Sequence, residues 1–209
     1  MNYLKVVLFL LFAGCISESE VSESVPENAY QINPLLIGET VPNLQVTNLS
    51  GEDLLLHDVI SGTPSVIVFY RGGWCPFCTT HLSDLVRYEE EIYGLGYQIL
   101  GISPDQPEFL RESIDQYDFQ YTLLSDSSME LTRAFGLAYR EDDVVVKQLK
   151  EGGMDIVESS GYKHKQLPVP AVYITDGEGK VLFQYVNPEY RERINGDILM
   201  TALNVFATQ

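Results

Sequence analysis

Two cysteines three positions apart, Cys75 and Cys78, are the residues of this chain best suited to do chemistry. They follow residues 71–74 (RGGW) and precede a stretch with helical periodicity. A cysteine at the start of a helix lies beside unpaired backbone N–H groups and the positive end of the helix dipole, which stabilise its thiolate. Pro76 suits the first helical position because it has no N–H to leave unpaired. Cys78, within the next turn, can close a disulfide with Cys75, so the pattern predicts a redox-active pair with Cys75 as the thiolate.

Two other interpretations of the cysteine pair stay open. It could supply half of a zinc site, but the third cysteine is Cys15, and His57, His81 and His164 show no paired ligand spacing. It could also be two inert core cysteines, since reduced cysteine is often buried. The redox interpretation is favoured because strand, glycine pair, tryptophan and helix occur together. It calls for no metal and no organic cofactor.

Composition limits the partners of the chain. The 209 residues are 45% hydrophobic, enough for a sizeable core, and 13 basic residues against 30 acidic ones give a net charge of −17. Such a surface repels phosphate backbones, so no nucleic-acid partner is expected. The longest apolar run, residues 6–14, is too short to span a bilayer.

The first fifteen residues have the pattern of an export signal. One positive charge at Lys5 precedes the apolar residues 6–12, and Ala13-Gly14-Cys15 resembles the bacterial lipobox, although Phe12 departs from its usual aliphatic residue. We therefore expect residues 1–15 to be a lipoprotein-type signal, with Cys15 acylated and the protein exported and lipid-anchored at the bacterial cell envelope. The alternative is an ordinary or uncleaved leader with an incidental cysteine. Residues 16–36 are expected to form an acidic disordered tether, with the membrane reached only through the lipid.

The remainder, residues 37–209, is expected to form one α/β domain. The segments with strand or helix patterns are strands at 66–70, 97–102 and 121–124, a helix from Pro76 to the Gly94 region, a helix from Pro107, and a helix that Ser127 and Glu130 cap and that ends near Gly136. A hairpin at 172–174 and 181–183 and a closing helix capped by Asn195 follow. Residues 138–166 fit this pattern least and are expected to be an insertion with one short strand at 154–157. The order predicts a central mixed sheet, parallel with an antiparallel edge, covered by helices on both faces.

With these residues in view, the sequence resembles the thioredoxin-fold redoxins, and most closely the peroxiredoxin-like branch of the alkyl hydroperoxide reductase/thiol-specific antioxidant family. The matching stretches are residues 69–78 (FYRGGWCPFC), 101–105 (GISPD), 124–126 (LSD), 134–136 (AFG), 167–176 (LPVPAVYITD) and 190–193 (YRER). The resemblance implies that Cys75 is the peroxidatic or attacking cysteine and Cys78 the resolving one, joined in a redox disulfide. It also implies a cis peptide bond at Pro170, which would shape a substrate groove; the alternative is an ordinary trans bond. Arg71 and Trp74 are expected to contact the substrate too, with packing beside the cysteine pair as the alternative for Trp74.

One departure from the family pattern is the absence of a hydroxyl side chain that would hold a peroxide oxygen. Typical peroxiredoxins carry Thr or Ser three residues before the peroxidatic cysteine and Pro seven before it, where this chain has Gly72 and Val68. Arg71 could stabilise the thiolate or a departing oxygen, or it could pair with a carboxylate at the strand end. His81 is expected to be solvated or at the core edge, with a proton relay as the alternative.

Two functions remain after the residues are considered. The first is a thiol peroxidase that reduces hydrogen peroxide or alkyl hydroperoxides in an antioxidant role and is itself reduced by a thioredoxin-like dithiol. The second is a membrane-tethered thiol-disulfide oxidoreductase that exchanges with protein disulfides. The short cysteine spacing favours exchange, whereas the matches at 101–105 and 167–176 favour the peroxidase. The sequence does not indicate an oligomeric state.

Overall fold

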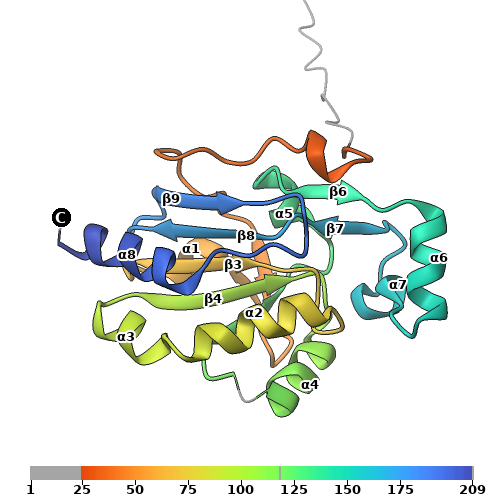
Figure 1. Cartoon of the computed structure of the whole chain (residues 1–209), viewed down its shortest axis with the longest axis horizontal. Helices are drawn as coiled ribbons and strands as arrows, with labels where there is room; N and C mark the ends of the chain where they lie inside the picture. The colour runs from red at the N-terminus through yellow and green to blue at the C-terminus, as the bar shows by residue number, and fades with distance from the viewer. Residues whose placement is uncertain (1–24, 118, 209) are drawn as a thin grey trace, which may run out of the picture.

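Three parallel strands form the middle of a seven-stranded sheet in the computed structural model, which describes residues 25–117 and 119–208. The strand order is β2-β1-β5-β4-β3-β8-β9, with β3, β4 and β5 parallel and the outer strands antiparallel (Figure 1). A separate antiparallel pair joins β6 and β7. The strands are β1 (Gln45–Thr47), β2 (Asp53–Leu55), β3 (Ser65–Phe69), β4 (Gln98–Ser103), β5 (Thr122–Ser125), β6 (Ala138–Arg140), β7 (Gln166–Pro168), β8 (Ala171–Thr175) and β9 (Val181–Val186). The predicted mixed sheet is confirmed.

Helices cover both faces of this sheet, as expected. They are η1 (Ala29–Gln31, a 3-10 turn), α1 (Leu56–Ile60), α2 (Pro76–Val86), α3 (Glu89–Gly94), α4 (Pro107–Tyr117), α5 (Glu130–Ala134), α6 (Asp143–Glu151), α7 (Ile156–Ser160) and α8 (Gly196–Ala207). Alternate residues of the fully buried β3 point to opposite faces: Val66 and Val68 pack in the core under α2, α3, α4 and α8, whereas Ile67 and Phe69 pack with α1 and α5 (Figure 1). A strand buried on both faces explains the unbroken apolar run that identified it.

The helix expected between Pro76 and Gly94 is instead two helices, α2 and α3. At the break, the N–H groups of Arg87 and Tyr88 donate to carbonyls three residues back, those of Asp84 and Leu85, at 3.1 and 2.9 Å. This tighter turn lets the chain change direction between the helices.

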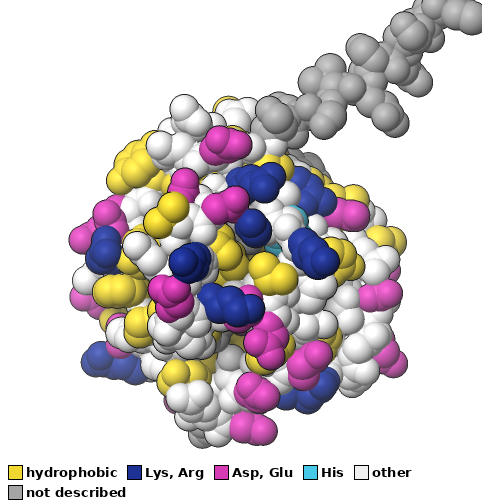
Figure 2. All heavy atoms as spheres, turned by 90° about the vertical axis from the view of Figure 1, so that its right-hand side faces the viewer, with side chains coloured by type: hydrophobic (Ala, Val, Ile, Leu, Met, Phe, Trp, Pro, Cys, Tyr) yellow, Lys and Arg dark blue, Asp and Glu magenta, His cyan; other side chains and the backbone are white. Residues whose placement is uncertain are grey.

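The expected insertion contains more order than one short strand. The strand predicted at 154–157 is wrong, because Asp155 caps helix α7 there: its carboxylate accepts the N–H groups of Val157 and Glu158. Antiparallel pairing of β6 with β7 closes the base of the insertion, and α6 and α7 lie between these two strands in the chain. Figure 2 looks onto the side of the molecule that carries α6 and α7, where basic and acidic side chains are interspersed.

The start of α5 also differs from the prediction. Ser127 and Glu130 form no capping box. Instead Asp126 accepts the N–H groups of Leu131 and Thr132 and the hydroxyl of Thr132, at 3.2, 2.7 and 2.6 Å. The later elements were predicted correctly, since β8 and β9 form the hairpin and the Asn195 side chain caps α8 by accepting the N–H of Asp197.

The folded domain begins earlier than the predicted Ile37. Pro26 accepts a hydrogen bond from the N–H of Arg140 at 2.7 Å, and the N–H of Leu35 donates to Phe135 at 2.9 Å, so this part of the predicted tether is attached to the domain. The predicted signal with Cys15, and residues 16–24 of the tether, lie outside the described residues. Within the part of the chain that the structure describes, no helix is long and apolar enough to cross a membrane.

Candidate active site

The two cysteines lie where β3 gives way to α2, as predicted. Cys75 is the N-cap of α2 with extended backbone angles, and Pro76 occupies the first turn. The N–H groups of Cys78 and Thr79 donate to the Cys75 carbonyl at 2.9 and 3.0 Å, which ties the pair into the first helical turn. Both cysteines are reduced and buried, with exposed fractions of 2% and 0%.

The environment makes the two thiols unequal. A hydrogen bond from the Cys78 side chain lowers the pKa of Cys75 to about 6 against the opposing effect of burial, and the charges of Arg71 and Arg193 add to the lowering. Burial and the neighbouring Cys75 raise the pKa of Cys78 well above its ordinary value. Near neutral pH, Cys75 is therefore a thiolate and Cys78 a neutral thiol that donates to it.

Arg71 combines both roles that the sequence left open. Its buried guanidinium lies 3.6 Å from Glu141, so it is paired with a carboxylate, and its charge lowers the pKa of Cys75. The same group lies over the rings of Tyr190 and Trp74, at 4.4 and 5.3 Å from their centroids. These cation–π contacts hold it beside the cysteine pair.

Three residues of this site were not singled out from the sequence. Arg193 donates from Nη2 to Cys78 Sγ at 3.4 Å, Tyr190 stacks on Arg71, and Glu141 pairs with Arg71. Residues 190–193 belonged to a stretch that matches the family, but no spacing rule links them to Cys78. Glu141 lies just after β6, in the insertion whose structure was predicted least well.

Gly72 shows why the hydroxyl residue of the family is absent. Its φ of +142° disfavours a side chain, and an added Cβ would lie 2.2 Å from Trp74 Nε1 and 2.8 Å from Asp105 Oδ1. Asp105 in turn accepts the N–H of Gly73 at 2.7 Å, and burial raises the pKa of its carboxyl to about 6. Trp74 and Asp105 thus occupy the space where a Thr or Ser side chain would lie.

Pro170 and His81 complete the predicted residues. The expected cis bond at Pro170 is wrong: every peptide bond among the described residues is trans, the lower-energy isomer. Hydrogen bonds from Val169 N–H to Leu137 and from Asn187 N–H to Pro170 flank this trans bond. His81 is at the core edge and buried, and burial lowers its pKa to about 4, so the ring is neutral. Among the described residues no group of three or more His, Cys, Asp or Glu side chains is placed to hold a metal ion.

A mixed sheet covered on both faces, with a cysteine pair at the start of a helix in which Cys75 has a lowered pKa, defines a thiol redox protein of thioredoxin-like fold. The model of the AhpC/TSA family matches residues 37–184, and the chain belongs to that family.

Similar proteins agree with this membership. The chain is 34% identical to the putative peroxiredoxin bcp of Haemophilus influenzae over 51% of this chain and 68% of that protein. It is 27% identical to 1-Cys peroxiredoxin A of Oryza sativa subsp. japonica, over 83% and 74%. The crystal structure of peroxidoxin BcpB from Mycobacterium tuberculosis superposes with a TM-score of 0.61 at 20% identity, covering 81% of this chain and 96% of that one. Xanthomonas campestris peroxiredoxin Q gives a TM-score of 0.62 at 22% identity, over 84% and 98%.

Proposed function

We propose that the protein is a thiol-dependent peroxidase that reduces hydrogen peroxide or alkyl hydroperoxides through Cys75 and Cys78, in an antioxidant role. The observation that carries this proposal is the inequality of the two thiols, a thiolate at Cys75 held by a neutral donor at Cys78. Relatives in the family bear peroxiredoxin names, and one similar structure is described by the alkyl peroxide reduction activity of a Xanthomonas campestris protein.

The chemistry follows from that inequality. The Cys75 thiolate attacks one peroxide oxygen, the O–O bond breaks, and the leaving oxygen takes a proton to depart as water or alcohol. Cys75 is then a sulfenic acid, and the Cys78 sulfur attacks it, releasing water and forming the Cys75–Cys78 disulfide. The peroxide gains two electrons and the two thiols lose them. Arg71 is proposed to stabilise the departing oxygen, and Trp74 and Pro170 to shape the path of the peroxide.

An external dithiol of thioredoxin type would complete the cycle. Its thiolate attacks the disulfide, and its second thiol resolves the mixed disulfide, which returns both cysteines to thiols. Cys75 is the better leaving group because its pKa is lower. A protein disulfide as the oxidant, the function of a thiol-disulfide oxidoreductase, is not favoured by the relatives.

The experiment is rapid-mixing measurement of hydrogen peroxide consumption by the pre-reduced protein, with loss of thiols followed in parallel. We expect rapid loss of two thiols per peroxide, no reaction for Cys75→Ser, and a single turnover to a sulfenic acid for Cys78→Ser. A rate no faster than that of free cysteine would reject the peroxidase. Trapping of mixed disulfides with proteins by Cys78→Ser would then support the oxidoreductase.

We also propose that the protein is exported and anchored through an acylated Cys15, with residues 1–15 as the signal. The support is the sequence pattern of a short basic region, an apolar stretch and Ala13-Gly14-Cys15. Expression in a bacterium fed a labelled fatty acid should label the protein, and Cys15→Ser should remove the label. An unlabelled parent protein would reject the anchor.

A further inference from the structure

A pocket of about 550 Å³ opens beside the cysteine pair, between α2 and the chain that leads into α8. Phe77 and His81, from the first turns of α2, line it. Arg193 lines the pocket too, and its Nη2 lies 3.4 Å from Cys78 Sγ. The volume lies within the range of small-molecule sites. A molecule in this pocket would therefore lie one side chain away from the redox pair.

The charge of this pocket is opposite to that of the molecule. Arg87, Arg191 and Arg193 line it with Asp84 as the one carboxylate, although the whole chain carries −17. Arg87 pairs with Asp84 at 3.8 Å, and Arg191 pairs with Glu189 at 3.1 Å, but both pairs are solvent-exposed and therefore weak. Within residues 25–117 and 119–208, Arg193 forms no ion pair with a carboxylate. The Arg193 guanidinium instead donates to the carbonyls of Tyr190 and Glu192 and to Cys78 Sγ. The two exposed guanidinium groups, those of Arg87 and Arg191, are therefore the ones available to an anion.

The rest of the lining suits a molecule with an apolar body. Phe77, which is 39% exposed, provides apolar surface at the pocket, whereas Leu85, Ile194 and Leu199 in its lining are almost fully buried. The buried Nε2 atom of His81, which also lines it, has no hydrogen-bond partner among the described residues. Buried polar groups are rarely left unpaired, so a polar atom of a bound molecule would satisfy this nitrogen.

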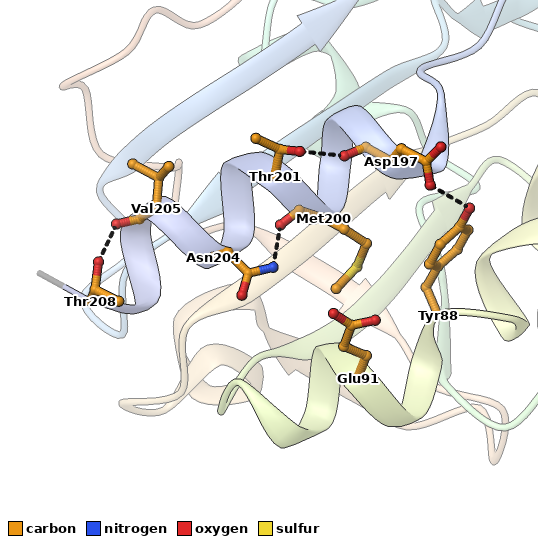
Figure 3. A pocket seen from close by; sticks show the side chains of 8 residues that line it. All are labelled: Tyr88, Glu91, Asp197, Met200, Thr201, Asn204, Val205 and Thr208. Atoms are coloured by element: carbon orange, nitrogen blue, oxygen red, sulfur yellow. Dashed lines mark hydrogen bonds between the residues drawn. The ribbon is translucent and has the colours of Figure 1, made fainter.

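The neighbouring hollow provides a contrast. Tyr88 lines both, and its hydroxyl contacts Asp197 at 3.3 Å, which fixes the ring between them (Figure 3). Figure 3 shows this second hollow along α8, where Glu91 and Asp197 line it and no Lys or Arg does. Of these two hollows, the one beside the cysteines therefore has the charge to hold an anion.

We propose that the pocket beside Cys78 binds a small amphipathic carboxylate, with its apolar body against Phe77 and its carboxylate on Arg87 and Arg191. Two reactants of the proposed function share this chemistry, an organic hydroperoxide that carries a carboxylate and a thiol reductant that carries one. The role of the pocket in turnover rests on the proposed function, but binding itself does not.

Calorimetric titration of the full chain with octanoate tests the binding. We expect octanoate to bind and the uncharged octanamide to bind at least about tenfold more weakly, because each charge-assisted hydrogen bond to Arg is strong. The double variant Arg87→Gln/Arg191→Gln should lose this preference, whereas Arg140→Gln, an exposed arginine outside the pocket, should keep it. Equal binding of octanoate and octanamide, or no binding of either, would overturn the proposal even if the peroxidase is confirmed. The same titration on Cys75→Ser measures the site without turnover.

Kinetics then identify the source of the carboxylate. If it belongs to the oxidant, the double variant should raise KM for a carboxylated hydroperoxide and leave KM for cumene hydroperoxide unchanged. If it belongs to the reductant, KM should rise for mercaptopropionate and not for mercaptoethanol. Both results support the pocket, whereas unchanged constants for all four reagents would reject a role in turnover.

Discussion

At the scale of single residues, the Cys78 hydrogen bond is the largest influence that lowers the pKa of Cys75. The charges of Arg71 and Arg193 contribute less, although both guanidinium groups are near. The resolving cysteine therefore has a second role before any oxidation occurs, because it keeps its partner ionised. Replacement of Cys78 should affect the first step of the cycle as well as the last.

We expect alkylation of Cys75 by iodoacetamide to rise with pH through a midpoint near 6 and to level off above it, because only the thiolate reacts. Cys78→Ala removes the donor and should move the midpoint upward by about one unit or more. Peptide mass spectrometry in a Cys15→Ser background assigns the label. An unchanged midpoint in Cys78→Ala would assign the lowering to the arginines instead.

Gly72 provides the second prediction at this scale. Restoring the family's hydroxyl by Gly72→Thr should destabilise the fold by about 2 kcal/mol or more, because the backbone is in the left-handed region and the new Cβ would approach Trp74 Nε1 to 2.2 Å. Urea unfolding followed by far-ultraviolet circular dichroism measures the loss. Gly96→Thr is the control, since its φ is +85° but its surroundings are open. An equal loss in both variants would mean that backbone strain alone is responsible.

At the scale of elements, the sequence predicted the features that depend on interactions between residues a few positions apart. The β3–α2 junction was predicted because Pro76 and the apolar run act within a few residues, and Asn195 was identified as a cap for the same reason. The β6–β7 pair was missed because its strands have three residues each, and their pairing lies between segments far apart in sequence. Arg193 contacts a sulfur 115 positions away, a relation that no sequence periodicity contains.

The Asp126 carboxylate shows how much one side chain contributes to an element. Asp126→Ala leaves two N–H groups at the start of α5 without their acceptor and should cost about 2–3 kcal/mol, while Asp126→Asn should cost less. Urea unfolding checks both variants.

The stability that the Asp126 carboxyl contributes depends on pH with a definite sign. Burial raises the pKa of Asp126 from 3.8 to about 6, so the folded protein binds this proton more tightly than the unfolded chain. The stability that the carboxyl contributes is therefore greatest at low pH and decreases as the pH rises through about 6. The stability difference between the parent and Asp126→Asn should narrow between about pH 4 and pH 7. A difference that widens would contradict the raised pKa.

At the scale of the whole molecule, two electric fields oppose each other. The net charge of −17 repels anions from a distance, whereas Arg71 and Arg193 attract them near the cysteines. Salt screens distant exposed charges strongly and buried ones much less, with a Debye length of about 10 Å at 0.1 M.

Added salt should therefore raise the rate of the reduced protein with the anionic disulfide reagent dithiobis(nitrobenzoate) relative to its rate with the cationic cystamine, by about threefold or more. Each rate is measured by rapid mixing and divided by the rate at which uncharged mercaptoethanol reacts with the same reagent. This division corrects for the difference in intrinsic reactivity between the two disulfide reagents. A ratio that stays constant or falls would mean that the net charge does not influence approach to the pair.

The position of Trp74, beside the cysteine pair and under the Arg71 guanidinium, has a practical consequence. Trp74 is the only tryptophan among the 209 residues, and it comes directly before Cys75 with a guanidinium 5.3 Å from its ring centroid. All tryptophan fluorescence of this protein therefore arises next to the sulfur that changes oxidation state. The chain carries its own optical reporter, so each oxidation and reduction of the pair can be followed in the native protein without an added label.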